Sequence, residues 1–352
     1  MREKVVNLIK REVNLRHIPG AVISVSFQGK MLMEEAVGYR MVYPKQRPMQ
    51  LDTIFDIASL TKVTATLPAI LKLIEIGEIY LNQKVASILP MFAQQGKQDI
   101  TIMDLLTHTS GLPSHKKYYL NHLLTKDKII KNIYNQELEY KTGTKVIYSD
   151  LGMITLYQVI ETVTNQSFEE FVRTNFFEPL KMYETSFKPT QDSNRLAATE
   201  YDEKAGSYKL GIVHDENTES MGGISGHAGL FSTVRDLQNY AAMVEQEGTF
   251  KGIQILSPAI LKLSKTNFTS FSDEFRGLGW LLNNNSVSSC GDLFSESSYG
   301  HTGFTGTSIW FDPSISLHVI LLTNRVHFGR IPEHILNLRA AVHNIIRSCI
   351  DE

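Results

Sequence analysis

Apolar and polar residues alternate in a way that predicts strands near both ends of the chain. Ala21–Phe27 and Met31–Val37 are rich in β-branched and aromatic residues, and the short polar segment Gln28-Gly29-Lys30 between them is typical of a hairpin. Strand patterns return near the other end, at Ser308–Phe311 and Leu317–Leu322. One antiparallel sheet assembled from distant segments accounts for this distribution.

Helical periodicity dominates the rest of the chain. The first residues predict an amphipathic helix, the middle predicts mostly helices, and a closing helix is expected from about Glu333 to Ile350. The periodic segments in the middle are Ile102–Leu106, Leu151–Val163 and Phe168–Phe177. We therefore expect an α/β (α+β) fold in which helices flank the sheet, residues 1–78 and 195–352 form a discontinuous sheet domain, and residues 79–194 form an inserted helical domain.

Composition narrows the classes of partner. The chain has 352 residues, 42% of them hydrophobic, and 35 Lys and Arg against 37 Asp and Glu give a net charge of −2. A balanced charge gives no electrostatic case for nucleic acid, so a small-molecule or short peptide substrate is expected. The sequence predicts no oligomeric state.

The distribution of apolar residues also bears on where in the cell the protein is expected. No window reaches the ~18 uninterrupted apolar residues of a membrane span, and no apolar signal region follows the basic N-terminal residues. A cytoplasmic protein is expected as the sequence stands, and an exported one if the N-terminus is truncated.

Metal and cofactor chemistry have no sequence signature here. Cys290 and Cys349 match no metal spacing and no disulfide framework, and no His-Glu-x-x-His segment occurs. We expect two unpaired structural cysteines, no metal and no cofactor.

Three short motifs carry the candidate chemistry: Ser59-Leu60-Thr61-Lys62, Tyr148-Ser149-Asp150 and His301-Thr302-Gly303. Residues three apart on a helix share a face, so the Lys62 amine is expected beside the Ser59 hydroxyl. Ser59 follows the strand-like run Thr53–Ile57 and begins a helix, where backbone N–H groups favour a developing oxyanion. A serine hydroxyl needs a neighbouring base to become a nucleophile.

Chance matches to Ser-x-x-Lys are common, and this chain contains a second copy, Ser114-His115-Lys116-Lys117. That copy lies in a polar loop after Gly111 and Pro113. We do not expect it to be catalytic. Taken alone, the first copy favours an ordinary helix N-cap and a solvated lysine over a catalytic pair.

The order and wide separation of the three motifs resemble the serine β-lactamase and penicillin-binding protein family. The resemblance is to class C β-lactamases, DD-peptidases, and related esterases and muropeptide amidases, and it covers nearly the whole chain. Further similar segments are Leu105–Pro113, Gly222-Gly223, Gly229–Thr233 and Leu322-Thr323-Asn324. The resemblance implies the β-lactamase/transpeptidase-like fold.

The resemblance also implies roles for the motif residues. Ser59 would attack a carbonyl, Lys62 and Tyr148 would share the proton, and the backbone N–H groups of Ser59 and Phe304 would form the oxyanion hole. Substrate contacts would come from Asp150, His301, Thr302, Gly303 and Phe304, with the strand at His301-Thr302 binding an extended substrate.

Two positions depart from the family pattern. Asp150 stands where the family most often has Asn, and an ionised Asp accepts hydrogen bonds but cannot donate them. We expect its carboxylate to favour the charged form of Lys62 and to move the role of base toward Tyr148. His301 replaces the lysine of many β-lactamases, which argues against a dedicated β-lactamase without excluding slow acylation by penicillins.

Other polar residues are ambiguous. His214, Asp215 and His227 lie in a glycine-rich polar run, where they either rim the cleft or, the preferred interpretation, are satisfied surface residues. Trp280, in Gly277-Leu278-Gly279-Trp280, is expected to be a packing residue.

The sequence thus predicts a serine hydrolase that forms an acyl-enzyme at Ser59 and cleaves an amide of a cell-wall-derived peptide or a β-lactam. A carboxylesterase on the same scaffold is the first alternative. A non-catalytic penicillin- or muropeptide-binding protein is the alternative from another class. An α/β-hydrolase is disfavoured because no Gly-x-Ser-x-Gly elbow occurs.

Overall fold

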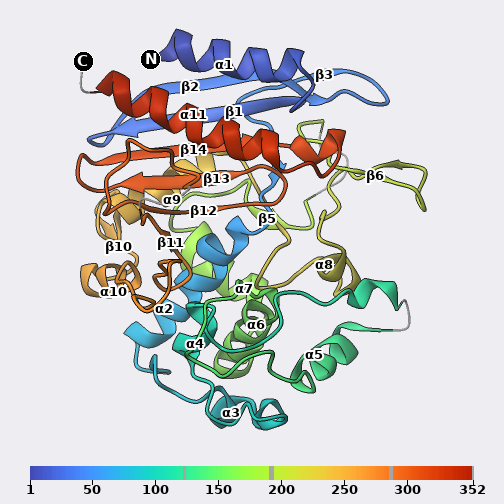
Figure 1. The fold of residues 1–352 in the computed structure, drawn as a ribbon, viewed down its shortest axis with the longest axis vertical. Coiled ribbons are helices and arrows are strands. Elements are labelled where there is room, and N and C mark those ends of the chain that lie inside the picture. The colour runs from blue at the N-terminus through green and yellow to red at the C-terminus, as the bar shows by residue number, and fades with distance from the viewer. Residues whose placement is uncertain (122–123, 190–193, 285–287, 351–352) are drawn as a thin grey trace.

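The main sheet joins strands from the two ends of the chain (Figure 1). We describe it from a computed structural model that covers residues 1–121, 124–189, 194–284 and 288–350. Its antiparallel strands, in spatial order, are β11 (Leu281–Leu282), β12 (Tyr299–Thr302), β13 (Ser308–Asp312), β14 (Leu317–Thr323), β1 (Gly20–Phe27), β2 (Lys30–Met41) and β3 (Arg47–Pro48). The pairing of β1 with β14, in which Val22 faces Leu322, confirms the predicted sheet built from both termini.

Apolar side chains cover both faces of this sheet, because successive strand residues point to opposite sides. On one face, Ile23 and Leu321 pack with helices α1 (Arg2–Asn14) and α11 (Glu333–Ile350). On the other, Val22 and Leu322 join the larger core, against which α9 (Val234–Glu245) packs. Figure 1 shows α1 and α11 together over one side of the sheet, with both chain ends nearby. The predicted first and last helices are confirmed.

Helices fill the opposite end of the molecule (Figure 1). They are α2 (Leu67–Glu75), α3 (Val85–Ile88), α4 (Ile102–Leu106), α5 (Lys126–Tyr134), α6 (Asp150–Thr164) and α7 (Phe168–Val172), while α8 (Glu216–Ser220) and α10 (Pro258–Ser264) lie later in the chain. Small sheets are formed by β4 (Phe55–Asp56), β8 (Leu230–Ser232) and β5 (Ser186–Phe187), by β6 (Tyr201–Asp202) and β7 (Ser207–Tyr208), and by β9 (Thr249–Phe250) and β10 (Ile253–Gln254). The division into domains at residues 78 and 195 stays a prediction.

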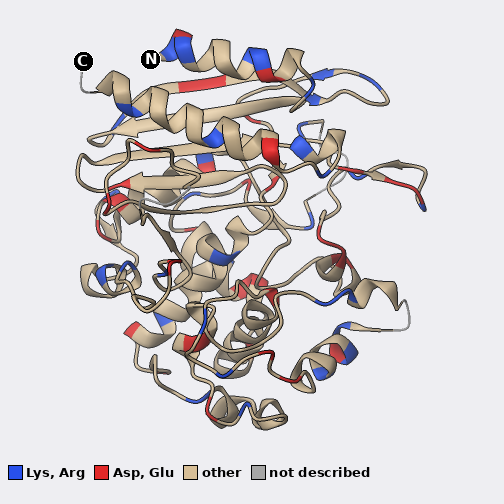
Figure 2. Cartoon of the chain, in the orientation of Figure 1, with Lys and Arg blue, Asp and Glu red and all other residues tan. Residues whose placement is uncertain are grey.

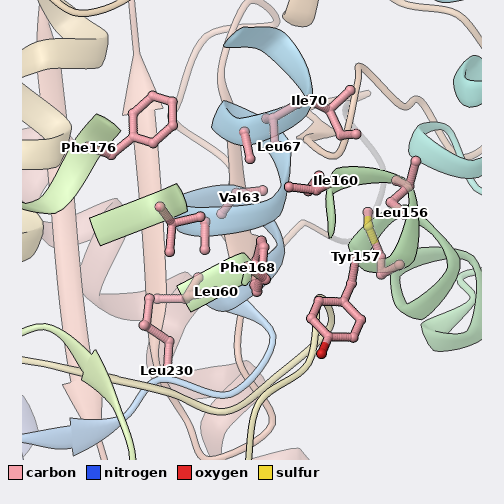
Figure 3. Close-up of a cluster of buried hydrophobic side chains, with 14 of the residues drawn as sticks. Leu60, Val63, Leu67, Ile70, Leu156, Tyr157, Ile160, Phe168, Phe176 and Leu230 are labelled. Atoms are coloured by element: carbon pink, nitrogen blue, oxygen red, sulfur yellow. The ribbon is translucent and has the colours of Figure 1, made fainter. Parts of the chain in front are cut away.

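The segment that follows Ser59 is anchored in the core between the two ends. A π-helical turn, Lys62–Thr66, leads into α2, and together they present Val63, Leu67 and Ile70 to the core, with Leu60 just before them. Figure 3 shows these side chains beside Leu156, Tyr157 and Ile160 of α6. Burying such a side chain stabilises the fold by about 1.5–3 kcal/mol. This contact therefore holds the segment that follows Ser59 firmly against α6.

Several smaller expectations can be compared directly. The run at Thr53–Ile57 contains only the two-residue strand β4. Trp280 is buried against Tyr299 and Phe311, as a packing residue should be. Cys290 and Cys349 are both unpaired.

Among the helices that the structure describes, none is long and apolar enough to cross a bilayer. Charged side chains of both signs are interspersed along the chain in Figure 2.

Candidate active site

Ser59 stands on a sharp turn between β4 and the π-helical turn. The preceding residue, Ala58, has a left-handed backbone with φ of 48°, which costs an alanine about 1–2 kcal/mol. Asp56 holds this turn, because one carboxylate oxygen accepts from the Ala58 N–H at 2.8 Å and the other from the His214 N–H at 2.6 Å. The strained turn leaves Ser59 partly exposed at the end of a buried strand.

Lys62 is fully buried beneath the Ser59 hydroxyl. Its Nζ lies 3.0 Å from Ser59 Oγ, 2.8 Å from Asp150 Oδ1 and 2.9 Å from the carbonyl oxygen of His227. A lysine ammonium has three N–H donors, which matches these three oxygen atoms. The predicted juxtaposition of the serine and the lysine is therefore present in the structure.

Asp150 controls the protonation of this lysine. Burial, the largest single influence, lowers the pKa of Lys62, but the charge of Asp150, the interaction with Tyr148 and the hydrogen bonds to both groups together raise it above its usual 10.5. Conversely, burial would raise the pKa of Asp150, yet Lys62, with His227 and His115, holds it well below its usual range. The two groups form an ammonium–carboxylate pair under the Ser59 hydroxyl.

Tyr148 completes the group of proton-carrying side chains. It directly precedes α6, whose N-cap is Ser149, and its phenol interacts with both Ser59 and Lys62. Burial raises the pKa of Tyr148, while the Lys62 charge opposes that rise. The Lys62 Nζ also lies 4.8 Å from the Tyr148 ring centre.

Two residues that the sequence analysis did not single out hold the Tyr148 ring. His108 packs against it at a centroid distance of 4.7 Å, and its Nδ1 accepts from the Ser149 N–H at 3.2 Å. The Arg276 guanidinium is the second group on this ring, and its central carbon lies 5.5 Å from the ring centre of Tyr148. His108 belongs to the family-like segment Leu105–Pro113, so a signal for it was present, whereas Arg276 has none.

The His-Thr-Gly motif lies on β12, next to the edge strand. The short strand β11 pairs with Tyr299 and Gly300 only, so among the described residues nothing pairs with the outer side of β12 at His301 and Thr302. Burial, and then the charge of Lys62, hold the pKa of His301 well below its usual value. The Nε2 atom of this buried histidine has no partner in the described chain.

Two backbone N–H groups near Ser59 are free. Neither the N–H of Ser59 nor that of Phe304 donates to any described residue. The turn that carries Phe304 packs closely on the serine turn: Thr307 Oγ1 donates to the Ile57 carbonyl at 3.0 Å, and a Cβ on Gly303 would lie 2.6 Å from that carbonyl. Glycine at 303 is therefore required for the approach of the two turns.

These groups border one cleft of about 360 Å³. Its lining is Ser59, Tyr148, Arg276, Leu281, His301, Thr302, Gly303, Phe304, Arg325, Pro332, Ile335, Leu336 and Arg339. Six of the eight expected site residues, all but Lys62 and Asp150, reach this lining. The three arginines were not predicted, because they come from separate segments with no local pattern.

Asp215 and His227 lie beside Asp150, where potential ligand atoms of these three residues approach within 4.8 Å of one another. All three already have partners: His227 Nε2 contacts Asp215 Oδ1 at 2.9 Å and Nδ1 contacts Ser225 Oγ at 2.9 Å, while Asp150 pairs with Lys62. The geometry thus describes a satisfied polar network rather than vacant ligands.

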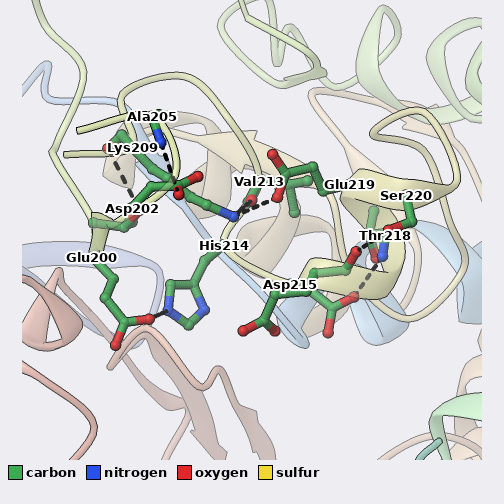
Figure 4. A network of polar contacts seen from close by, with 12 residues as sticks. Glu200, Asp202, Ala205, Lys209, Val213, His214, Asp215, Thr218, Glu219 and Ser220 are labelled. Atoms are coloured by element: carbon green, nitrogen blue, oxygen red, sulfur yellow. Dashed lines mark hydrogen bonds and ion pairs between the residues drawn. The ribbon is translucent and has the colours of Figure 1, made fainter. Parts of the chain in front are cut away.

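The preferred interpretation of these histidines as surface residues is wrong. His214 is 4% exposed and His227 1% exposed. Figure 4 shows His214 bound to Glu200, and Asp215 at the start of α8, where it accepts from the Thr218 N–H. The His214 N–H donates to Asp56, and the His227 carbonyl accepts from Lys62. Both contacts join distant segments, so sequence spacing does not reveal them.

The second Ser-x-x-Lys copy has a different environment. Ser114 and Lys117 are exposed and lie on a loop, so no buried amine lies under the serine. The loop nevertheless contacts the site: the Ser114 carbonyl accepts from the Asp150 N–H at 2.9 Å, and His115 Nδ1 lies 3.5 Å from Asp150 Oδ2.

Comparisons with known proteins agree with this geometry. A sequence model of the family described as Beta-lactamase matches residues 5–342. An N-acetylmuramyl-L-alanine amidase of Bacillus subtilis is 33% identical over 92% of this chain and 81% of its own length. A putative D-alanyl-D-alanine carboxypeptidase of Escherichia coli is 31% identical over 86% of this chain and 73% of its own.

Solved structures show the same fold. A hydrolase with promiscuous acyltransferase activity superposes with a TM-score of 0.78 at 23% identity, covering 97% of this chain and 98% of that one. The octameric penicillin-binding protein homologue of Pyrococcus abyssi gives a TM-score of 0.76 at 24% identity, covering 98% of this chain and 77% of that one. The family match across nearly the whole chain and these relatives show that the chain belongs to the β-lactamase family of hydrolases.

Proposed function

We propose that this protein is a serine hydrolase that forms an acyl-enzyme at Ser59 and cleaves an amide of a cell-wall-derived peptide. The observation that carries the proposal is the 3.0 Å contact between Lys62 Nζ and Ser59 Oγ at the edge of a cleft. A positioned base and free backbone donors are the two requirements of acyl transfer, and both border this cleft. Ser59 Oγ attacks the carbonyl carbon, its proton passes to the Lys62–Tyr148 pair, and the oxyanion is held by the Ser59 and Phe304 N–H groups.

The proton pathway follows from the charges. Lys62 is held as an ammonium by Asp150. In our proposal the base is the phenolate form of Tyr148: burial raises the pKa of this phenol, so the phenolate is the minor form, and the adjacent Lys62 charge stabilises it. The phenolate takes the Ser59 proton and becomes the phenol. The phenol then returns the proton to the leaving amine.

The substrate proposal rests on relatives and on the cleft. Relatives named as a muramyl-alanine amidase and as putative D-alanyl-D-alanine carboxypeptidases support a peptidoglycan-derived amide ahead of a β-lactam. The open side of β12 at His301 and Thr302 suits an extended peptide, which can add hydrogen bonds to a strand edge. Arg276 and Arg325, which also line the cleft, favour a substrate that carries a carboxylate.

A carboxylesterase is the second candidate, because one wall of the cleft is apolar. Phe304 is 48% exposed and Leu336 51% exposed, and Pro332 and Ile335 lie with them. Such a wall favours a lipophilic acyl or alcohol group. A silent binding relative is less well supported, since the serine, lysine and tyrosine are all in place.

The deciding experiment is intact-protein mass spectrometry of wild type and Ser59→Ala. Each is incubated briefly with a muramyl-L-alanine peptide, a D-alanyl-D-alanine thioester, a penicillin and an activated ester, and hydrolysis is followed in parallel. We expect an adduct or turnover that requires Ser59, fastest with one of the peptides. Ser59→Thr is the matched control for a shape change. Equal turnover by Ser59→Ala, or neither adduct nor turnover in wild type, would overturn the proposal.

A further inference from the structure

Arg339 is a buried cation with an unusual set of partners. It comes from α11, is 4% exposed and forms no ion pair with a carboxylate in the described ranges. Burial, and then the nearby charge of Arg325, lower the pKa of this guanidinium to about 9. An unpaired buried charge is costly, so its retention calls for a compensating interaction.

The interaction is with the turn that carries Phe304. One nitrogen of Arg339, Nη2, donates to the Gly303 carbonyl at 2.9 Å and to the Thr307 carbonyl at 2.8 Å. The Gly303 carbonyl also accepts from the Gly306 N–H at 3.0 Å. Both N–H groups of one guanidinium nitrogen thus clamp the two ends of the turn from Gly303 to Thr307.

The Gly303 carbonyl and the Phe304 N–H belong to the same peptide group. A positive donor on the carbonyl oxygen draws electron density from the amide and makes its N–H a stronger hydrogen-bond donor. That N–H has no partner among described residues and lies at the cleft beside Ser59. Arg339 therefore polarises the peptide group whose N–H faces the cleft beside Ser59.

We propose that Arg339 is a positioning residue for the oxyanion hole: its guanidinium fixes and polarises the Gly303–Phe304 peptide, so that the Phe304 N–H binds the developing oxyanion more tightly. The inference rests on the proposed acylation of Ser59. It assigns to α11, near the end of the chain, a part in transition-state stabilisation that is separate from substrate binding.

The experiment compares wild type with Arg339→Met, which removes the charge and keeps the bulk, and Arg339→Lys, which keeps the charge. Three readouts are taken: kcat and KM, the affinity for a boronic acid that mimics the tetrahedral state, and the infrared carbonyl stretch of the Ser59 acyl-enzyme. Removing a whole oxyanion donor costs ~10²–10³ in kcat, so we expect Arg339→Met to lose roughly ten- to a hundredfold.

The expected pattern is specific. In Arg339→Met, kcat and boronate affinity fall together, KM changes little and the acyl carbonyl stretch moves to higher frequency, while Arg339→Lys recovers part of each. Arg40→Met is the control, because Arg40 is another buried arginine that donates to a carbonyl, that of Pro48, away from the cleft.

Outcomes separate the two proposals. A Ser59 adduct whose carbonyl stretch and boronate affinity are unchanged in a folded Arg339→Met protein would overturn the role of Arg339 alone. Absence of any Ser59-dependent adduct or turnover in wild type would overturn both this role and the proposed function. If Arg339→Met does not fold, the partial loss expected in Arg339→Lys decides.

Discussion

The Asp150 carboxylate lies 2.8 Å from the Lys62 ammonium, directly beneath the Ser59 hydroxyl. The motif that Tyr148-Ser149-Asp150 resembles carries an amide at this position, so the chain places a full negative charge where that pattern has a neutral group. The pair keeps Lys62 charged in the resting protein, and its removal should be visible in the pH dependence of the reaction.

For Asp150→Asn, we expect the acidic limb of the kcat/KM profile to move to lower pH. Loss of an opposite charge at this distance lowers the pKa of Lys62, and of the coupled Lys62–Tyr148 pair, by about 1–3 units. Steady-state rates between pH 4 and 10 measure the shift. His115→Gln is the matched control, since His115 contacts the same carboxylate only at 3.5 Å. An acidic limb that stays in place in Asp150→Asn would contradict the proposed proton pathway.

Gly303→Ala should abolish turnover and lower stability. Its new methyl group would meet the side-chain oxygen of Thr307 and lie 2.6 Å from the Ile57 carbonyl, forcing the two turns apart. Overpacking of this kind costs about 1–3 kcal/mol, which thermal unfolding can detect. Gly152→Ala adds a methyl group at an ordinary 3.6 Å from Leu105 inside α6 and should leave both properties near wild type. Full activity in Gly303→Ala would show that the turns need not touch.

Asp215→Asn should lower stability at neutral pH but not in acid. The pKa of Asp215 in the folded protein is held below its usual 3.8, against burial, chiefly by His227. A lowered carboxyl pKa stabilises the fold fully above 3.8, and this contribution disappears as the pH falls through the folded pKa. Asn retains the N-cap of α8, so the variant isolates the charge.

We expect Asp215→Asn to lose on the order of 2 kcal/mol in the free energy of unfolding at pH 7. Urea unfolding at pH 7, 3 and 2 should show the difference from wild type shrinking toward the lowest pH, because the contribution is lost only below 3.8. A constant difference at all three values would mean that the charge of Asp215 does not contribute.

Arg276→Gln should separate charged from neutral substrates. Arg276 lines the cleft beside Tyr148 and, since a hydrogen bond to a charged group contributes about 1.5–3 kcal/mol, kcat/KM for a carboxylate-bearing peptide should fall by roughly 10- to 100-fold. A neutral ester should lose much less. Parallel kinetics with the free acid and the methyl ester of one peptide provide the measurement. Equal losses on both would assign Arg276 to the support of Tyr148 instead.

Much of the fold is readable from local patterns. The buried strand β14 is a continuous apolar run, and α11 occupies the predicted range Glu333–Ile350, because both patterns follow from residues near each other in sequence. The run Thr53–Ile57 was expected to be a longer strand, but only Phe55 and Asp56 pair with β8, while Ile54 forms an isolated bridge to Leu196.

The site is only partly readable. Ser59 and Lys62 are three residues apart in a Ser-x-x-Lys motif that resembles the family pattern, and this spacing predicted their contact. Arg339 donates to a carbonyl 36 positions away, and Lys62 donates to the His227 carbonyl, 165 positions away. Such contacts are set by tertiary packing and leave no periodic signature.

The pairing of β1 with β14 has a consequence for synthesis. Ser59 leaves the ribosome early, but the strand that anchors its domain, the His301 edge and the Arg339 clamp are all made later. At ordinary rates of translation the interval is on the order of tens of seconds. During that time the nascent chain carries Ser59 and Lys62 without Phe304, the second donor of the proposed oxyanion hole, so the proposed mechanism predicts no acyl transfer until almost the entire length has emerged.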